Sequence, residues 1–199
     1  MYGLPHTTLV QRQLPKKAIY TKFELKPAQR ESFDADVSRI DIAAVISPRT
    51  IPAIAEGETI KEFYLLTVQL KRKDYDEKNI VMLSKLIPQN ILFALQYEDE
   101  TQLATYHTKL LYTPWISNDN ATIPLTGLNL NSVWENIIKE IGEIEVQEGN
   151  TLEEQIQKDE QKRKLLAQIA TLENKMAKEP QPKRKREYYD QIKKLKIQL

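Results

Sequence analysis

IKEFYLLTVQLKRKDYDEKNIVMLSKLIPQNILFALQYEDETQLATYHTKLLYT, residues 60–113, is the stretch that decides the fold. Its hydrophobic period and its punctuation predict the order strand, helix, strand, strand. The four segments are residues 60–73, 74–88, 89–100 and 101–113. In the first strand, one face is apolar throughout, whereas the other turns polar toward Gln69 and Lys71. This order predicts the centre of an α+β core.

Residues that favour the start or the end of secondary structure set the limits of these elements. The helix is expected over residues 74–86, with acids at its start and Pro88 beyond its end. Residues 90–97 form a short, mostly apolar run that is typical of a strand covered on both faces. The charged triplet at residues 98–100 then predicts a reversal before a strand over residues 102–112. The two strands would form a hairpin.

The segments before this centre complete one side of the core. Residues 1–23 contain scattered prolines, which favour an extended arm laid on the core. Residues 27–39 suit a helix, and residues 40–47 form a compact β-rich run that carries Asp41. Residues 47–57 then form a long, proline-containing connection of the kind that often lies beside functional sites.

The segments after the centre close the core. Residues 121–125 predict a short edge strand, in which a proline prevents further pairing. A helix follows, whose start is marked by Asn131 and Ser132, with Glu135 placed as in a capping box. The acidic stretch that ends at Asn150 marks a boundary, so the core domain is expected to span residues 1–150.

Residues 151–199 predict a helical hairpin. They hold thirteen Lys/Arg against eight Asp/Glu, whereas residues 1–150 hold sixteen against twenty. Their apolar residues recur only at helical spacing, and the sequence EPQP at residues 179–182 interrupts the pattern. The stripes are too narrow for a globular core, so they should pair as an antiparallel coiled coil or against a second subunit in a homodimer. The expected interface comprises Leu165, Ile169, Leu172, Met176, Tyr188, Ile192, Leu195 and Leu199.

A run of four cations opens the second helix of this hairpin: Lys183, Arg184, Lys185 and Arg186. Such a run is commonly a solvated helix face. At a projecting tip it would also suit the phosphates of a nucleic acid or an acidic protein partner. Both interpretations stay open at the level of the sequence.

Composition limits the cellular setting. The chain has no cysteine, which excludes disulfides and thiolate metal sites and fits a reducing compartment. No apolar run approaches the ~20 residues that span a bilayer, and the first residues lack the apolar block of a signal peptide. A cytoplasmic protein without a membrane contact is expected.

Most catalytic signatures are missing. The five glycines are scattered and form no phosphate-binding loop. His6 and His107 are far apart, and His107 is expected within a strand, where a structural role is favoured over a catalytic one. No metal or cofactor is therefore expected for the leading interpretation.

One arrangement keeps a nuclease open as the alternative. The order helix 27–39, strand with Asp41, strand ending at Lys71, helix and strand resembles the PD-(D/E)xK nuclease core. In that core acids hold Mg²⁺ or Mn²⁺ and a lysine steadies the attacking water. Asp41, Gln69 and Lys71 would be the catalytic set, with Gln69 standing where the family has an acid.

Several segments together resemble the bacterial and archaeal family known as domain of unknown function 4391. They are LPKKAIYTKF (14–23), the block FYLLTVQLKRK to QLATYH (63–107), YTPWI (112–116), LTGLNLNSVWENIIKEI (125–141) and KRKREYYDQIKKLKIQL (183–199). The resemblance implies a genetic setting beside helicases and DNA methyltransferases of restriction-like, antiphage systems. The family has no established activity to carry over.

Together these observations predict an accessory or scaffolding protein of a DNA-targeting defence system. Its hairpin would dock a helicase or methyltransferase of the same system, and it would catalyse nothing alone. The divergent metal-dependent nuclease is the alternative. A nucleic-acid binder that uses the basic run of the hairpin is the third possibility.

Overall fold

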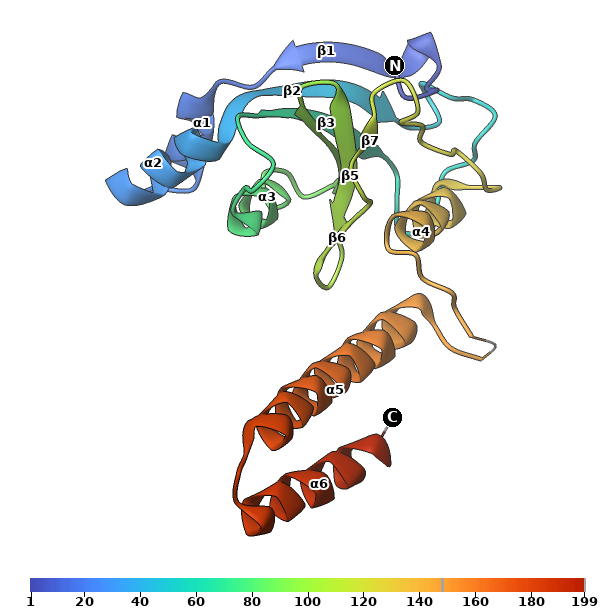
Figure 1. The fold of residues 1–199 in the computed structure, drawn as a ribbon. Coiled ribbons are helices and arrows are strands. Elements are labelled where there is room, and N and C mark those ends of the chain that lie inside the picture. Colours follow the sequence, from blue (N-terminus) through green and yellow to red (C-terminus); the bar gives the residue numbers. More distant parts are fainter. Residues whose placement is uncertain (148, 199) are drawn as a thin grey trace. The chain divides into compact units, whose positions relative to one another are not determined.

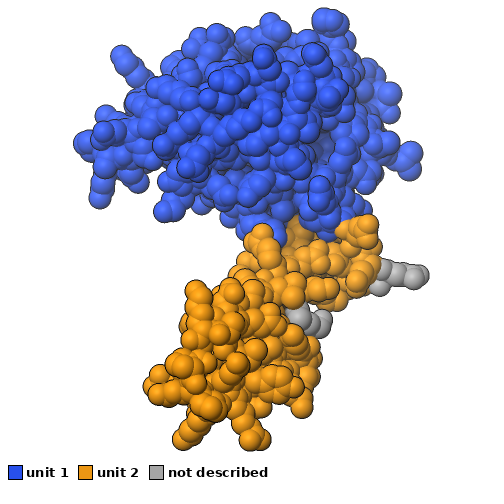
Figure 2. Space-filling model, viewed as in Figure 1, with its two compact units in different colours: residues 1–144 blue, residues 145–199 orange. Residues whose placement is uncertain are grey.

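The computed structural model describes residues 1–147 and 149–198. The chain divides into two compact units, Met1–Ile144 and Glu145–Leu199, which are coloured separately in Figure 2. The first unit holds a mixed sheet with helices, and the second holds two helices that pack together (Figure 1). The predicted α+β class is confirmed.

The described part of the first unit contains a seven-stranded sheet in the order β1-β2-β3-β4-β5-β6, with β7 also paired to β5. The strands are β1 (Leu9–Gln13), β2 (Val37–Ile46), β3 (Phe63–Leu70), β4 (Asn90–Tyr97), β5 (Glu100–Tyr106), β6 (Leu110–Tyr112) and β7 (Ile116–Ser117). β3 and β4 run parallel, and every other pair is antiparallel. The parallel pair requires a crossover, which is supplied by a helix.

Helices cover both faces of the sheet. The helices of the first unit are α1 (Lys16–Lys22), α2 (Pro27–Asp36), α3 (Glu77–Leu83) and α4 (Leu130–Ile141), together with a 3-10 turn over His6–Thr8. Ile19 of α1, Phe33 of α2 and Leu83 of α3 pack in one cluster with the apolar face of β3 and β4. On the opposite face, the ring centroids of Trp134 of α4 and Phe63 of β3 lie 5.0 Å apart. The core is therefore a three-layer structure.

The centre of the fold follows the sequence closely. β4 spans the predicted residues, and β3 and α3 lie within the predicted segments. Asp76 caps α3, because its carboxylate accepts a hydrogen bond from the Lys78 backbone N–H at 3.0 Å. The helix predicted over 27–39 ends earlier, at Asp36, because Val37 begins β2.

The N-terminal segment is not the extended arm that its prolines suggested. Residues 9–13 form β1, which pairs with β2, and residues 16–22 form α1, which buries Ile19. Pro15 occupies the N-cap of α1, a place where a missing N–H is tolerated. The prolines therefore mark element limits and not an irregular chain.

The strand predicted over residues 102–112 is wrong in one respect. The chain reverses at residues 107–109, where the His107 N–H donates to the Lys109 carbonyl at 3.0 Å, and β6 folds back onto β5. His107 thus lies in a turn and not in a strand. Residues 108–109 are polar, but a strand period tolerates two polar residues, so the sequence pattern did not reveal the turn.

Two further predictions need correction in the segment before α4. Residues 121–125 form no strand, and the Ile123 N–H donates to the Tyr2 carbonyl at 3.0 Å. The short strand in this part of the chain is β7, which pairs with β5. The N-cap of α4 is Asn129, whose side chain accepts from the Ser132 N–H at 3.0 Å. Asn131 instead accepts from the Ile60 N–H at 2.9 Å and so fastens the β2–β3 connection to α4.

The second unit is the helical hairpin. α5 spans Leu152–Lys178 and α6 spans Pro182–Lys196. Thr151 and Glu154 form a capping box at the start of α5, and Pro182 takes the first helical position of α6. Among the described residues, no helix is long and apolar enough to cross a membrane.

Candidate docking site

Helices α5 and α6 pack together, and we call the line of apolar residues that the helical spacing predicts between them the seam. Ile169 and Ile192 are its most buried members, at 4% and 5% exposure. The other described members are only half-buried: Leu165, Leu172, Met176, Tyr188 and Leu195. Leu199 lies outside the described residues. The seam is thus a single line of buried contacts with partly open flanks.

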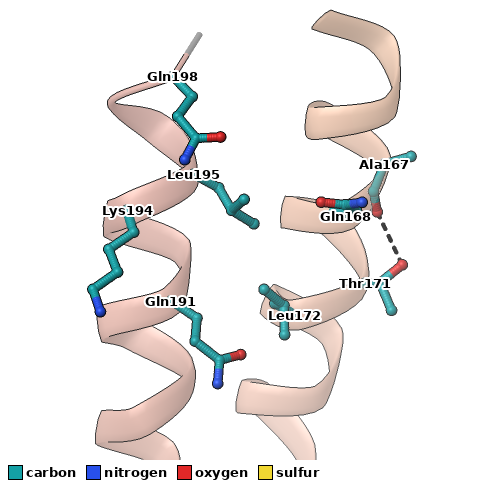
Figure 3. Close-up of a pocket in the computed structure, with 8 residues that line it drawn as sticks. All are labelled: Ala167, Gln168, Thr171, Leu172, Gln191, Lys194, Leu195 and Gln198. Atoms are coloured by element: carbon teal, nitrogen blue, oxygen red, sulfur yellow. Dashed lines mark hydrogen bonds between the residues drawn. The ribbon is translucent and has the colours of Figure 1, made fainter. Parts of the chain in front are cut away.

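An open groove of about 680 Å³ runs between the two helices on one side of this seam. Figure 3 shows Leu172 of α5 and Leu195 of α6 pointing toward one another across it. Gln168 and Gln191 stand beside these leucines, and Lys194 of α6 lines the groove at its outer edge. The groove therefore has an apolar floor and a polar rim.

Polar contacts contribute little to the packing of the two helices. Lys196 of α6 pairs with Glu173 of α5 at 3.1 Å, and this is a contact between exposed groups. The Thr171 hydroxyl donates to the Ala167 carbonyl at 2.9 Å, within α5 (Figure 3). Exposed pairs of this kind contribute little stability, on the order of 0–1 kcal/mol. Apolar contact along the seam is the main stabilising interaction of the hairpin.

Further apolar side chains of the hairpin face solvent. Leu166 is 47% exposed, Tyr189 is 57% exposed and Ile197 is 78% exposed. Two helices alone cannot bury a stripe wider than one seam, which is why bundles commonly contain three or four. The hairpin accordingly presents more apolar surface than it covers.

The basic run predicted at residues 183–186 lies in the first turns of α6, and all four side chains are exposed. Lys175 and Lys178 occupy the last turn of α5, on the other side of the connection. We call these six cations, Lys175, Lys178, Lys183, Arg184, Lys185 and Arg186, the basic tip. Within the part of the chain that the structure describes, none of their side chains forms an ion pair or a hydrogen bond.

The residues of the nuclease alternative are brought only partly together. The register of β2 and β3 sets Arg39 opposite Gln69 and Asp41 opposite Thr67, so Asp41 and Gln69 lie on the same sheet face. Lys71 turns elsewhere, because its Nζ donates to the Asp34 carbonyl at 2.6 Å.

Each member of this set already has another partner. The Arg39 guanidinium donates to both carboxylate oxygens of Asp41, at 2.7 and 2.8 Å. The Gln69 amide donates to the Gln96 carbonyl at 3.4 Å. Residues 1–147 and 149–198 contain no group of three or more His, Cys, Asp or Glu side chains that could hold a metal ion. Asp41, Gln69 and Lys71 therefore bond to other groups of the chain and not to one another.

Sequence reasoning missed a buried carboxylate in the core. Asp36 is completely buried, and its carboxylate accepts from Arg72 Nε at 2.7 Å, from the Asp76 N–H at 2.8 Å and from Asn79 Nδ2 at 2.8 Å. These contacts join the end of α2 to the start of α3. Every hydrogen bond pairs Asp36 with a residue far along the chain, so no local pattern in the sequence predicts that this carboxylate is buried.

A second polar cluster lies beside α1. The Asp34 carboxylate accepts from Lys16 Nζ at 2.8 Å and from the Tyr20 hydroxyl at 2.6 Å. Burial and then the bond to Asp34 raise the pKa of Tyr20 to about 12. Burial acts to raise the pKa of Asp34 as well, but the bonds from Lys16 and Tyr20 outweigh it, and the pKa is lowered. Both partners are therefore held in one charge state over a wide pH range.

The fold and this geometry define an α+β core protein that carries a helical hairpin. A family model described as a domain of unknown function, DUF4391, matches residues 2–199. The chain therefore belongs to this family. No curated protein and no solved structure matches the chain.

Proposed function

We propose that this protein is a non-catalytic adaptor that docks a partner protein in the groove between α5 and α6. The observation that carries the proposal is the groove itself, with Leu172 and Leu195 on its floor and amides on its rim. A surface that is apolar in the middle and polar at its edges is typical of helix-binding grooves. Catalytic chemistry is not needed for this role.

The occupant that fits best is an amphipathic helix of the partner. A third helix laid along two antiparallel helices completes a bundle and buries their open flanks. Its apolar stripe would be narrow, to match one row of leucines. Acidic residues should flank that stripe, because Lys194 lines the groove and residues 151–199 carry thirteen Lys/Arg against eight Asp/Glu.

The partner we propose is a helicase or DNA methyltransferase of a restriction-like or antiphage system. The family resemblance supports this setting. A complex of this kind would leave DNA chemistry to the partner and give the present chain the task of assembly.

Charge reversal at the rim tests the proposal with little risk to the fold. Gln168 and Gln191 are exposed, so Gln168→Glu with Gln191→Glu should leave both helices intact. We expect the full-length double variant to capture at least tenfold less helicase or methyltransferase from its native cells than the natural chain does. Capture should fall because the new glutamates at the rim repel the acidic residues expected on either side of the partner helix.

A matched control has the same charge change away from the groove. Gln157 and Gln161 are also exposed on α5, and neither lines the groove. Gln157→Glu with Gln161→Glu should capture the partner as the natural chain does. Equal capture by both double variants and the natural chain would contradict a docking site in this groove.

The nuclease is the second candidate, and the order of α2, β2, β3, α3 and β4 supports it. It requires Mg²⁺- or Mn²⁺-dependent cleavage of DNA that Lys71→Ala abolishes without unfolding the chain. No cleavage with either metal, by the chain or by its assembly, would exclude this candidate.

A further inference from the structure

The six cations of the basic tip lie around one short connection. Residues 179–181 link the last turn of α5 to the first turn of α6, so Lys178 and Lys183 are only five positions apart. Prolines at positions 180 and 182 restrict the backbone of this link. The N-terminal end of α6 adds the partial positive charge of its unpaired N–H groups. The basic tip therefore gathers six cationic side chains and a helix N-terminus around one short link.

Little negative charge offsets the tip. Glu179 and Glu187 are the acids between residues 175 and 187, and the Glu179 carboxylate accepts the Gln181 N–H at 3.0 Å. Elsewhere on the hairpin, cations do find acids: Lys164 pairs with Glu160 at 2.7 Å. The cations of the basic tip differ from Lys164, because within the described residues they have no acidic partner on the hairpin.

The chemistry of the tip favours phosphate over protein. No residue from 177 to 187 is a large exposed apolar side chain, and protein interfaces depend on buried aromatic or aliphatic anchors. A nucleic-acid backbone needs only cations that replace its counterions. We propose that the basic tip binds the phosphate backbone of double-stranded nucleic acid, without reading its sequence.

Helix geometry limits how many phosphates the tip can meet. Residues 183–186 are consecutive, so their side chains leave α6 at steps of about 100° and point in different directions around the helix. They cannot all contact one surface laid along the side of α6. The duplex must instead meet the end of the hairpin, which allows about three phosphate contacts. Three contacts give a slope of log affinity against log salt of about −3.

The experiment uses the full-length chain and a fluorescent 20-base-pair DNA duplex of arbitrary sequence in an anisotropy titration. We expect affinity to fall about 60-fold between 50 and 200 mM salt, as a slope near −3 requires. The variant Lys183→Gln, Arg184→Gln, Lys185→Gln, Arg186→Gln should lose at least tenfold in affinity at 50 mM salt. Its slope should also become shallower.

The matched control neutralises four cations on α5, with Lys158→Gln, Lys162→Gln, Arg163→Gln and Lys164→Gln. Arg163 lies fifteen residues before Lys178 on α5, which is about 22 Å along the helix and beyond the screening length. We expect the control to keep its affinity within about threefold. Equal losses in both variants would overturn the proposal, because the hairpin would then act only through its overall charge.

Two further arms separate the alternatives. An RNA duplex of the same length should bind with the same slope, because phosphates are the shared chemistry; a preference for one duplex would show that more than phosphate is recognised and would overturn the proposal in this form. Tighter binding of a poly-glutamate peptide than of the duplex would overturn it in favour of an acidic protein. A slope near zero for the natural chain would overturn it without any variant.

The tip variant should still capture the protein partner through the groove, so failure of the phosphate proposal is distinguishable from failure of the docking proposal.

Discussion

Asp36 joins three parts of the core at the residue scale. Its carboxylate is the meeting point of the end of α2, the chain just after β3 and the start of α3. Arg72, its ionic partner, is 54% exposed and keeps contact with water. The pair therefore combines a buried anion with a hydrated cation, and the backbone N–H of Asp76 supplies part of the compensation for burying the charge.

We expect Asp36→Asn to lower the free energy of unfolding by about 2–4 kcal/mol, because charge-assisted bonds to a buried carboxylate are lost. Denaturant unfolding of the full chain measures this loss. Asp41→Asn is the control, since the Asp41–Arg39 pair is exposed on the arginine side, and it should cost less than about 1 kcal/mol. Equal losses in the two variants would show that Asp36 has no special role.

The bond between Tyr20 and Asp34 predicts a pH dependence. The pKa of Tyr20 is raised to about 12 from the ordinary 10.0, by burial and by the bond to Asp34. The stabilisation is thus fully present below pH 10 and is lost as the pH rises toward 12, because the unfolded chain releases the proton first.

Asp34→Asn should lower the pKa of Tyr20, because it removes a negative charge and an acceptor beside the hydroxyl. Ultraviolet titration of the phenolate band, compared with Tyr20→Phe in each background, isolates this one tyrosine. An unchanged alkaline midpoint in Asp34→Asn would contradict the assigned cause.

These residue-scale contacts were beyond reach of the sequence. Asp36 and Asn79 are 43 positions apart, and an acid at the end of an amphipathic helix is usually solvated. Asp41 and Lys71 were assigned to one site because of their order in the chain, yet each has a different partner in the fold. Order along a sequence does not specify which side chains meet.

At the element scale, the parts with strong local signals were predictable. β3, α3 and β4 combine a clear hydrophobic period with Pro88 as punctuation, and local period sets their type. The short strands β1, β6 and β7 were missed, because a strand of two to five residues has little period of its own. Such strands are specified by the sheet edge to which they pair.

The seam of the hairpin gives an element-scale prediction. Ile169→Ala and Ile192→Ala should each destabilise the hairpin by about 2–4 kcal/mol, because each removes a buried side chain from a single line of contacts. Hydrogen exchange of the amides of α5 and α6 in the full chain measures the change. Amides of β3 and β4 in the core serve as the internal reference.

Leu166→Ala is the matched control, because Leu166 lies on α5 but is 47% exposed. It should leave exchange in the hairpin nearly unchanged, as surface substitutions usually do. Equal acceleration by Leu166→Ala and Ile169→Ala would contradict the seam described here.

At the scale of the whole molecule, the buried core and the proposed docking surface lie in different units of the chain. The core buries Phe33, Phe63 and Phe93 completely and needs no partner to do so. In the hairpin, five described residues of the seam are only half-buried, and three large apolar side chains are exposed. The sequence predicted the two helices of the hairpin, because helical spacing is a local property. It did not predict the groove, whose shape depends on how closely the two helices approach.

The central claim is that this groove holds a helix of a helicase or methyltransferase, and site-specific crosslinking tests it most directly. The chain has no cysteine, so Gln191→Cys introduces a unique site for a photoactivatable label at the groove. Lys162→Cys, on an exposed part of α5 outside the groove, is the control. We predict that the label at Gln191 crosslinks to one helical segment of the partner, with little product from Lys162. Crosslinking to a second copy of the chain, or equal yield from both positions, would contradict the account.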